Sequence, residues 1–489
     1  MQNPVPSKFN RQSRFFSFSL AALIALSSIS SGCISARRTP NLEHIFAEAR
    51  IRTGKRPVIV IPGILGSELK NSKTNETVWP SAFRTSQEGL PMTPDLSANR
   101  DDLVPGKIIE TLRLARILPE VYVYRDLLEA LRNYAGYREG SWTNPSSDGD
   151  KDTFYVFAYD WRQDNVHNAR ELVRQIQRLK DALHRPDLQF NVVAHSMGGL
   201  IARYAAMYGN EDLPAGDGEI KPSWAGAKHI SKIVMIGVPN EGSADALATL
   251  IDGYSITEGL RRRVPLLNKL TAEDAVRSPS VFQLLPHAGV AKFLDENLKV
   301  IPLDLYDPEV WKRYGWTPIY SPEFRRRYTN HSASPEVDTV SLLDEYLAVT
   351  LKRTRRFHQA LDAGIGMDQP VTLLAIGGDC EETLSSPVII RDSKNNRWVT
   401  LTRPREFRNS AGVKLSKRQV TEAMYEPGDG RVTRKSLLGE NISIIGGQET
   451  PVRLRLTYAV FGCDLHGQLQ RNKTLQDNAL TAIVGEVIK

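Results

Sequence analysis

Short apolar runs alternate with amphipathic stretches along most of this chain. The runs have the composition of buried strands, are bounded by turn residues, and cover residues 58–61, 153–158, 190–194, 233–238 and 371–376. Apolar positions recur at helical spacing in residues 124–134, 169–183 and 200–208. Strands that alternate with helices are typical of a doubly wound, mostly parallel sheet. The pattern therefore predicts an α/β fold.

Two stretches depart from this rhythm. Residues 239–370 are polar and rich in proline and arginine, with short helical patches, and they are too long to form one loop. We therefore expect a helical cap, inserted at about residues 243–370 over the C-terminal edge of the sheet. Residues 81 to about 120 are expected to form a second, smaller insertion.

The first 33 residues have the pattern of a secretory signal. Lys8, Arg11 and Arg14 precede the apolar segment 15–26, which is too short to span a bilayer comfortably. The small residues that follow end in Gly-Cys at Cys33 and resemble the lipobox of bacterial lipoproteins. Cys33 is then either the lipidated first residue of the mature chain or part of a plain signal or uncleaved anchor. All of these alternatives predict export. The protein is then expected in a bacterial cell envelope, where a lipid can anchor it to the outer membrane, or in the medium after secretion.

Composition and charge indicate which classes of binding partner the protein can have. The chain has 489 residues, of which 41% are hydrophobic and 24% charged, as in an ordinary globular protein. Its net charge is +7, but the arginine runs at 261–263 and 325–327 are not interleaved with aromatic residues. This arrangement argues against nucleic acid as a partner. The runs are expected to be solvated, with contact to anionic lipid headgroups as the alternative.

The cysteines indicate whether the protein forms a disulfide and whether it binds a metal. With Cys33 set aside, Cys380 and Cys463 are an even pair in a chain expected to be exported, so we expect them to form a disulfide. Two buried thiols are the alternative. No Cys/His spacing typical of a metal site is present, and we expect neither a metal nor an organic cofactor.

A serine lies where a predicted strand turns into a predicted helix. The sequence around Ser196 is Ala-His-Ser-Met-Gly, with small residues at positions 194 and 198, where strand and helix approach closely. This is the pattern of a nucleophile elbow, which lifts the serine hydroxyl out of the sheet. An ordinary buried turn is the alternative interpretation.

A serine nucleophile needs a base and an acid that orients the base. In α/β-hydrolases the chain order is Ser, Asp or Glu, then His. His466 is the histidine placed late, just before a predicted C-terminal helix, and we take it as the base. Asp429 lies in a Gly-rich turn, and Asp379 directly follows a predicted strand. The residues alone leave both carboxylates open as the acid.

The oxyanion formed by attack on an ester needs backbone donors. Met197 follows the nucleophile and supplies one amide. The loop after the first strand, Pro-Gly-Ile-Leu-Gly at 62–66, is expected to supply the other from Ile64, with Leu65 as the next choice.

Nine short sequence motifs occur along the chain. They are VIVIPGILGSEL (58–69), VWP (78–80), VYVYRDLLEALRNYAGY (121–137), FAYDWR (157–162), AHSMGG (194–199), GVPNEGS (237–243), SVFQLLP (280–286), GDGRV (428–432) and HGQLQRN (466–472). In this order they resemble the lecithin–cholesterol acyltransferase family of α/β-hydrolases. The resemblance places the acid in the Gly-Asp-Gly motif, which favours Asp429, and it fits His466 as the base and Ile64 and Met197 as oxyanion donors. It also implies FAYDWR as active-site floor, although these residues alone could equally be a buried structural cluster.

The resemblance implies an acyl-serine enzyme that acts on lipid or phospholipid esters, as a hydrolase or an O-acyltransferase. Its partners are then a lipid substrate and a membrane or lipid surface; the sequence carries no signal of oligomeric state. Two other hypotheses remain open: a catalytically silent lipid-binding surface protein, and an amidase or peptidase on the same fold.

Overall fold

A computed structural model of the chain describes residues 39–81, 90, 92, 101–112, 121–216, 218–255, 269–287, 292–330, 339–365, 368–392, 395–445 and 448–488. The chain divides into a short unit, Met1–Asn41, and a large unit, Leu42–Lys489, which carries the features described below. The predicted signal segment and Cys33 lie outside the described residues. Within the described ranges, no helix is both long and apolar enough to cross a membrane.

A seven-stranded parallel sheet forms the centre of the large unit. Its spatial order is β24-β15-β10-β9-β1-β8-β7, and every neighbouring pair is parallel. The strands are β1 (Val58–Ile61), β7 (Arg138–Glu139), β8 (Thr153–Val156), β9 (Phe190–His195), β10 (Ile230–Ile236), β15 (Thr372–Gly378) and β24 (Tyr458–Gly462). The predicted α/β class and parallel sheet are confirmed.

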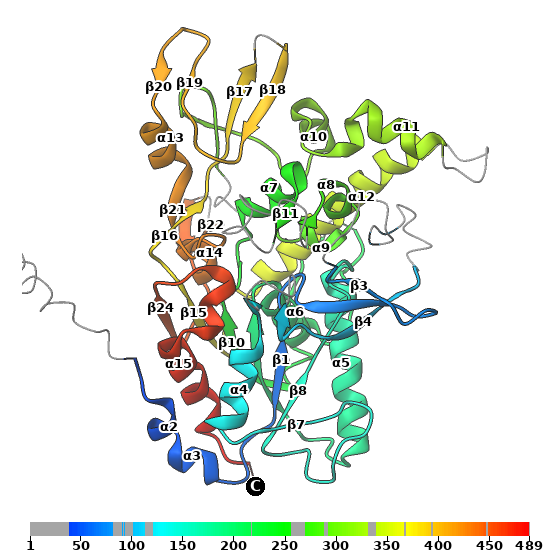
Figure 1. Ribbon diagram of the computed structural model, residues 1–489, viewed down its shortest axis with the longest axis vertical. Coiled ribbons are helices and arrows are strands. Elements are labelled where there is room, and N and C mark those ends of the chain that lie inside the picture. The colour runs from blue at the N-terminus through cyan, green and yellow to red at the C-terminus, as the bar shows by residue number, and fades with distance from the viewer. Residues whose placement is uncertain are drawn as a thin grey trace, which may run out of the picture. The chain divides into compact units, whose positions relative to one another are not determined.

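Helices cover both faces of this sheet, because its side chains alternate between two cores. Ile59 and Ile61 of β1 enter one core, and Val58 and Val60 enter the other. The first core contains apolar residues of α5 and α6, and the second contains those of α4 and α15. α4 and α15 lie side by side (Figure 1). These helices are α4 (Arg125–Asn133), α5 (Asn165–Ala182), α6 (Met197–Tyr208) and α15 (Lys473–Val484).

The segment between β10 and β15, called the cap below, is largely helical. Its helices are α7 (Ala244–Asp252), α8 (Ala272–Val276), α9 (Pro279–Phe282), α10 (Pro308–Tyr314), η2 (Pro318–Tyr320), α11 (Pro322–Asn330) and α12 (Thr339–Asp362). Its short strands are β11 (Tyr254–Ser255), β12 (Lys269–Leu270), β13 (Phe293–Leu294) and β14 (Val300–Ile301).

A second segment, between β15 and β24, joins this cap and was not predicted. Strands β17 and β18 extend the cap pair β13–β14 into a four-stranded sheet with its own apolar core. The segment consists of β16 (Glu381–Leu384), β17 (Val388–Asp392), β18 (Arg397–Leu401), β19 (Phe407–Arg408), β20 (Lys414–Leu415), α13 (Lys417–Met424), β21 (Tyr425–Gly428), α14 (Arg434–Leu438), β22 (Asn441–Ile445) and β23 (Gln448–Val452).

The remaining elements flank the first strand and the C-terminal helix. A three-stranded antiparallel sheet, β3-β2-β4, follows β1, and much of the insertion predicted at 81–120 lies outside the described residues. These elements are α2 (Leu42–Ile45), α3 (Ala47–Ile51), β2 (Ser67–Asn71), β3 (Thr77–Trp79), β4 (Leu103–Ile108), β5 (Thr111–Leu112), β6 (Val121–Tyr122) and η3 (His466–Arg471).

Candidate active site

Ser196 occupies a sharp turn between β9 and α6. Its backbone is left-handed, with φ = 52° and ψ = −128°, a conformation that a non-glycine residue adopts only where its surroundings enforce it. A Cβ at Gly198 would lie 2.5 Å from the Pro62 carbonyl oxygen, and one at Gly63 would lie 2.8 Å from the Ser196 Cβ. The close approach of β1, its following loop and the start of α6 therefore requires glycine at both positions. The strand–turn–helix context predicted for Ser196 is present.

His466 and Asp429 complete a hydrogen-bonded chain with Ser196. His466 begins η3, and its Nε2 lies 2.9 Å from the Ser196 Oγ while its Nδ1 lies 2.8 Å from Asp429 Oδ2. Because a carboxylate only accepts hydrogen bonds, Nδ1 carries the proton and Nε2 is free to accept one from the serine. The arrangement has the connectivity of a nucleophile, a base and an orienting acid.

The Asp429 carboxylate is itself held in place by the backbone. Its side chain is 2% exposed, and its Oδ1 accepts hydrogen bonds from the amides of Arg431 (3.0 Å) and Val432 (2.8 Å). The carboxylate therefore has one oxygen fixed by the turn and the other directed at His466.

Asp379, the rival carboxylate, has a different partner. It follows β15, as predicted, but its Oδ2 lies 3.7 Å from Arg434 Nη1 in a partly exposed ion pair. The structure thus brings Asp429, and not Asp379, to the imidazole of His466.

Three side chains hold the loop after β1. The Tyr159 hydroxyl donates to the Pro62 carbonyl (2.9 Å), and the Trp79 indole N–H donates to the Leu65 carbonyl (3.0 Å). The Gly63 amide donates to the Tyr124 hydroxyl oxygen (2.8 Å). The loop is therefore fixed at both ends and in its middle.

The expected oxyanion donors lie in this loop and at the start of α6. The Gly63 N–H is already used by Tyr124, whereas Ile64 and Leu65 both line the cavity that contains Ser196. Met197 is the first residue of α6, where amide N–H groups have no intrahelical acceptor and carry the positive end of the helix dipole. Ile64 and Met197 remain the predicted oxyanion donors, with Leu65 as the next choice.

His195 and Tyr124 form a second buried network that the sequence did not predict. The Tyr124 hydroxyl lies 2.8 Å from His195 Nδ1, and His195 Nε2 lies 3.2 Å from the backbone carbonyl of His466. That carbonyl can only accept, so Nε2 carries the proton and Nδ1 accepts from Tyr124. Burial, together with the nearby His466 ring, lowers the pKa of His195 to about 3 and keeps it neutral at physiological pH. The available signal was a histidine next to Ser196 at the end of a fully buried strand.

The FAYDWR motif forms a buried structural cluster. Arg162 binds Asp160 (Nη2 to Oδ2, 2.7 Å) and Asp101 (Nη2 to Oδ1, 3.0 Å), and Trp161 packs edge-on against Trp79 at 5.5 Å. None of the four residues Tyr159 to Arg162 is among the described residues that line the Ser196 cavity. The geometry therefore favours a buried structural cluster over an active-site floor as the interpretation of this motif.

A largely apolar cavity of about 440 Å³ opens at Ser196. Its polar groups include Ser196, Asp429, His466 and Arg431, and Arg431 also contacts Asp245 of α7. The Arg431 guanidinium lies 4.2 Å from the centre of the Tyr254 ring. The walls come from both the sheet loops and the cap, and their apolar residues are Ile64, Leu65, Ile109, Val123, Pro239, Ala246, Leu270, Val281, Leu284, Val432 and Leu465.

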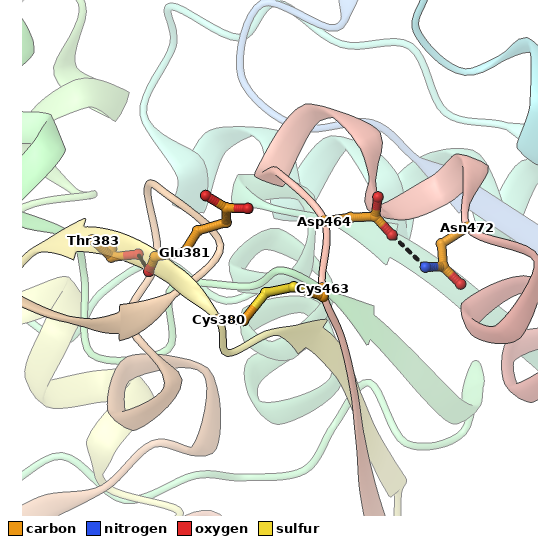
Figure 2. The surroundings of a disulfide bond; sticks show 6 residues. All are labelled: Cys380, Glu381, Thr383, Cys463, Asp464 and Asn472. Atoms are coloured by element: carbon orange, nitrogen blue, oxygen red, sulfur yellow. Dashed lines mark hydrogen bonds between the residues drawn. A yellow bond between two sulfur atoms is a disulfide. The ribbon is translucent and has the colours of Figure 1, made fainter. Parts of the chain in front are cut away.

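A disulfide joins Cys380 to Cys463, the pair expected from the sequence, with 5.4 Å between their Cα atoms (Figure 2). Cys380 follows β15 and Cys463 follows β24, three residues before His466. On the other side, Thr383 Oγ1 accepts the Gly430 amide (2.8 Å), which ties β16 to the turn that carries Asp429. The bond therefore connects the segments that present the acid and the base.

Comparisons with known proteins agree with this fold. Residues 109–344 match the model of the lecithin:cholesterol acyltransferase family. The lecithin-cholesterol acyltransferase-like protein 4 of Arabidopsis thaliana is 22% identical over 254 residues, which are 47% of this chain and 42% of that protein. An uncharacterized protein of Saccharomyces cerevisiae is 22% identical over 445 residues, covering 78% of this chain and 56% of that one. The chain thus spans about half the length of these curated relatives.

Among solved structures, a chain of the Tle4–Tli4 complex superimposes with a TM-score of 0.51 at 14% identity. The match covers 88% of this chain and 98% of that chain. At this level of identity the likeness shows the fold alone.

Proposed function

The chain belongs to the lecithin:cholesterol acyltransferase family, and from that premise we propose that it is an acyl-transfer enzyme acting on lipid esters through an acyl-serine intermediate. The observation that carries the proposal is the hydrogen-bonded chain Ser196–His466–Asp429 at an apolar cavity. An ester of a fatty acid presents a long apolar tail and one polar reacting group, which is the complement of such a cavity.

In the proposed mechanism Ser196 Oγ attacks the ester carbonyl while His466 Nε2 takes its proton. Asp429 holds the imidazole in the required tautomer and stabilises the imidazolium that forms. The negative charge on the carbonyl oxygen is stabilised by the amides of Ile64 and Met197. His466 then gives its proton to the leaving alcohol, and the acyl group remains on Ser196 as an ester.

The second half of the reaction repeats these roles with a new nucleophile. His466 takes a proton from water or from a lipid alcohol, which attacks the acyl-serine, and then gives that proton to Ser196 Oγ as the acyl product leaves. Water gives hydrolysis, and an alcohol gives O-acyl transfer. We propose hydrolysis with transfer as a competing outcome. The cavity of about 440 Å³ is partly lined by the cap, whose shape decides which acceptor reaches the acyl-serine.

We also propose that the enzyme works at a lipid surface outside the cytoplasm, in a bacterial cell envelope or after secretion. The disulfide between Cys380 and Cys463 supports an oxidising compartment, in which such bonds persist. The signal segment predicted at residues 1–33, with Cys33 as a lipidation site, supports the same location.

The test is hydrolysis of p-nitrophenyl esters of increasing chain length and of phosphatidylcholine vesicles. We expect the wild type to release fatty acid, and Ser196→Ala to lose activity and labelling by a fluorophosphonate probe. Ser223→Ala is the matched control: Ser223 contacts Met207 near the far end of α6, so both properties should persist. Added lipid alcohol then separates transfer from hydrolysis.

A folded wild type that cleaves none of these esters and takes up no probe would overturn the proposal in favour of a silent lipid-binding protein. Cleavage of amides in preference to esters would favour an amidase or peptidase.

A further inference from the structure

Three side chains with metal-ligand chemistry meet between the sheet and the cap. Glu241 lies in the loop after β10, His287 follows α9, and Asp362 is the last residue of α12. His287 Nε2 lies 3.4 Å from Glu241 Oε2 and 3.3 Å from Asp362 Oδ1, and one donor atom from each residue lies within 4.8 Å of the others. None of the three is among the described residues that line the Ser196 cavity.

Glu241 is the group that the protein leaves unsatisfied. Its side chain is 0% exposed, yet neither carboxylate oxygen has a hydrogen-bond partner among the described residues. A buried carboxylate without partners is costly, and such groups in proteins are paired or coordinate metals. The nearest donor is His287 Nε2, which lies 3.4 Å from Glu241 Oε2 and forms its hydrogen bond with Asp362 Oδ1 at 3.3 Å.

The guanidinium of Arg203 interacts with the cluster but does not hydrogen-bond to its carboxylates. The buried guanidinium of Arg203 interacts electrostatically with Glu241 and Asp362, but its hydrogen bonds go to Asn240 Oδ1 (3.0 Å) and the Leu361 carbonyl (2.9 Å). The oxygens of Glu241, unpartnered among the described residues, therefore remain available as metal ligands.

Two of the three separations between donor atoms agree with tetrahedral coordination. A tetrahedral zinc ion, with bonds of about 2.0–2.1 Å, holds its ligand atoms about 3.3–3.4 Å apart. The separations from His287 Nε2 to Glu241 Oε2 (3.4 Å) and to Asp362 Oδ1 (3.3 Å) agree with this value. One imidazole and two carboxylates are ligands that zinc accepts, whereas calcium and magnesium prefer oxygen alone.

Neighbouring side chains also fix the orientation of the His287 imidazole. His358 stacks on His287 with ring centres 3.9 Å apart and planes 10° apart. His358 is held in turn by the Tyr306 hydroxyl at Nδ1 (2.6 Å) and by the Gln283 carbonyl at Nε2 (3.0 Å). Supporting contacts of this kind orient the ligands of metal sites.

We propose that Glu241, His287 and Asp362 bind one divalent transition-metal cation, with zinc as the best fit. The ion lies outside the reaction chamber and links the loop after β10 to two cap elements. Glu241 lies two residues before Ser243, whose side chain caps α7 and donates to the Arg431 carbonyl. The ion thus fixes the cap against the sheet, independently of the proposed acyl transfer.

The test uses the full chain, freed of any affinity tag, stripped with a chelator and titrated with Zn²⁺ and with Co²⁺. We expect one equivalent of metal per chain by elemental analysis, a rise in Tm of several degrees, and the visible absorption of tetrahedral Co²⁺. Glu241→Gln and His287→Gln should weaken binding by at least about 100-fold. His229→Gln is the matched control, because His229 is also buried but contacts Lys180 rather than this cluster, and it should bind as the wild type does.

The proposal fails if the stripped wild type shows neither a Tm shift nor the Co²⁺ spectrum, or if Glu241→Gln and His287→Gln bind as the wild type does. Should the variants not fold, the wild-type titration alone decides. Loss of ester hydrolysis on its own would not bear on the metal site, since binding is measured directly.

Discussion

The hydroxyl of Tyr124 lies 2.8 Å from Nδ1 of His195, the residue that precedes Ser196. The same hydroxyl accepts the amide of Gly63, directly before Ile64. One buried tyrosine thus connects the strand that carries the proposed nucleophile to the loop that carries a proposed oxyanion donor. We regard Tyr124 as a positioning residue for the oxyanion site.

Tyr124→Phe removes this connection without changing the shape of the side chain. We expect kcat for a p-nitrophenyl ester to fall about 10-fold, less than the roughly 100-fold or more that follows loss of a donor itself, with KM nearly unchanged. Stability should fall by about 1–3 kcal/mol, because the Gly63 amide loses its buried acceptor.

Tyr137→Phe is the matched control for Tyr124→Phe. Its hydroxyl bonds to the carbonyls of Arg56 (3.2 Å) and Ile483 (3.3 Å), away from the cavity. It should lose stability and keep kcat. Equal kcat values for the two variants would contradict a positioning role for Tyr124.

Substitution of the two aspartates tests which one orients the base. Asp429→Asn leaves the volume intact but removes the charge that fixes the tautomer of His466, and kcat should fall roughly 1,000- to 10,000-fold. Asp379→Asn disrupts only a partly exposed ion pair with Arg434, so kcat should change by less than about 3-fold. Steady-state kinetics on both variants measure this, and the reverse order of effects would reassign the acid.

Local sequence was sufficient to identify two of the three residues of the proposed triad. Ser196 and Gly198 are neighbours in the chain, so the turn they form leaves a compact signature between a strand and a helix. His466 was identifiable from its place after the last apolar run. Asp429 was not separable from Asp379 by residues alone, because both follow glycines in turns, and only the family resemblance favoured it.

The relationships that sequence could not give depend on tertiary contacts. Glu241 and Asp362 are separated by the whole helical cap, so their approach to His287 leaves no spacing pattern. The β-rich segment between Glu381 and Gly428 consists mostly of strands of two to five residues, too short for a clear period. The edge strand β7 is two exposed charged residues and lacks an apolar signal altogether.

The neutral state of His195 predicts a particular response to acid. Its pKa is about 3 in the folded protein, against 6.5 as the ordinary value. Below pH 6.5 the imidazole of His195 therefore binds a proton in the unfolded chain but not in the folded chain. This difference lowers the free energy of unfolding by up to about 1.4 kcal/mol for each unit by which the pH falls.

His195→Asn removes that titration while its carboxamide oxygen can still accept from Tyr124. The variant should be less stable than the wild type at pH 8, with a gap that narrows as the pH falls towards 4. Urea unfolding at several pH values measures it. Tyr137→Phe, which removes no group that titrates in this range, should show a constant gap, and a constant gap for His195→Asn would contradict the buried neutral imidazole.

The disulfide between Cys380 and Cys463 is expected to contribute both to stability and to the geometry of the active site. The two cysteines are 83 residues apart, and closing a loop of this length corresponds to about 4.5 kcal/mol of chain entropy in the unfolded state. The double substitution Cys380→Ser, Cys463→Ser should therefore lower the free energy of unfolding by roughly 2–5 kcal/mol.

The same substitution separates the two roles of the bond. Cys463 lies three residues before His466, and β16, which follows Cys380, pairs with β21 immediately before Asp429. Without the disulfide these two segments can move apart, which lengthens the hydrogen bond between His466 and Asp429. We therefore expect kcat to fall several-fold at a temperature where the variant is still folded, while KM stays nearly constant. Kinetics together with circular dichroism at that temperature measure both effects. A variant that is less stable but has wild-type kcat would show that the disulfide acts on the unfolded chain alone.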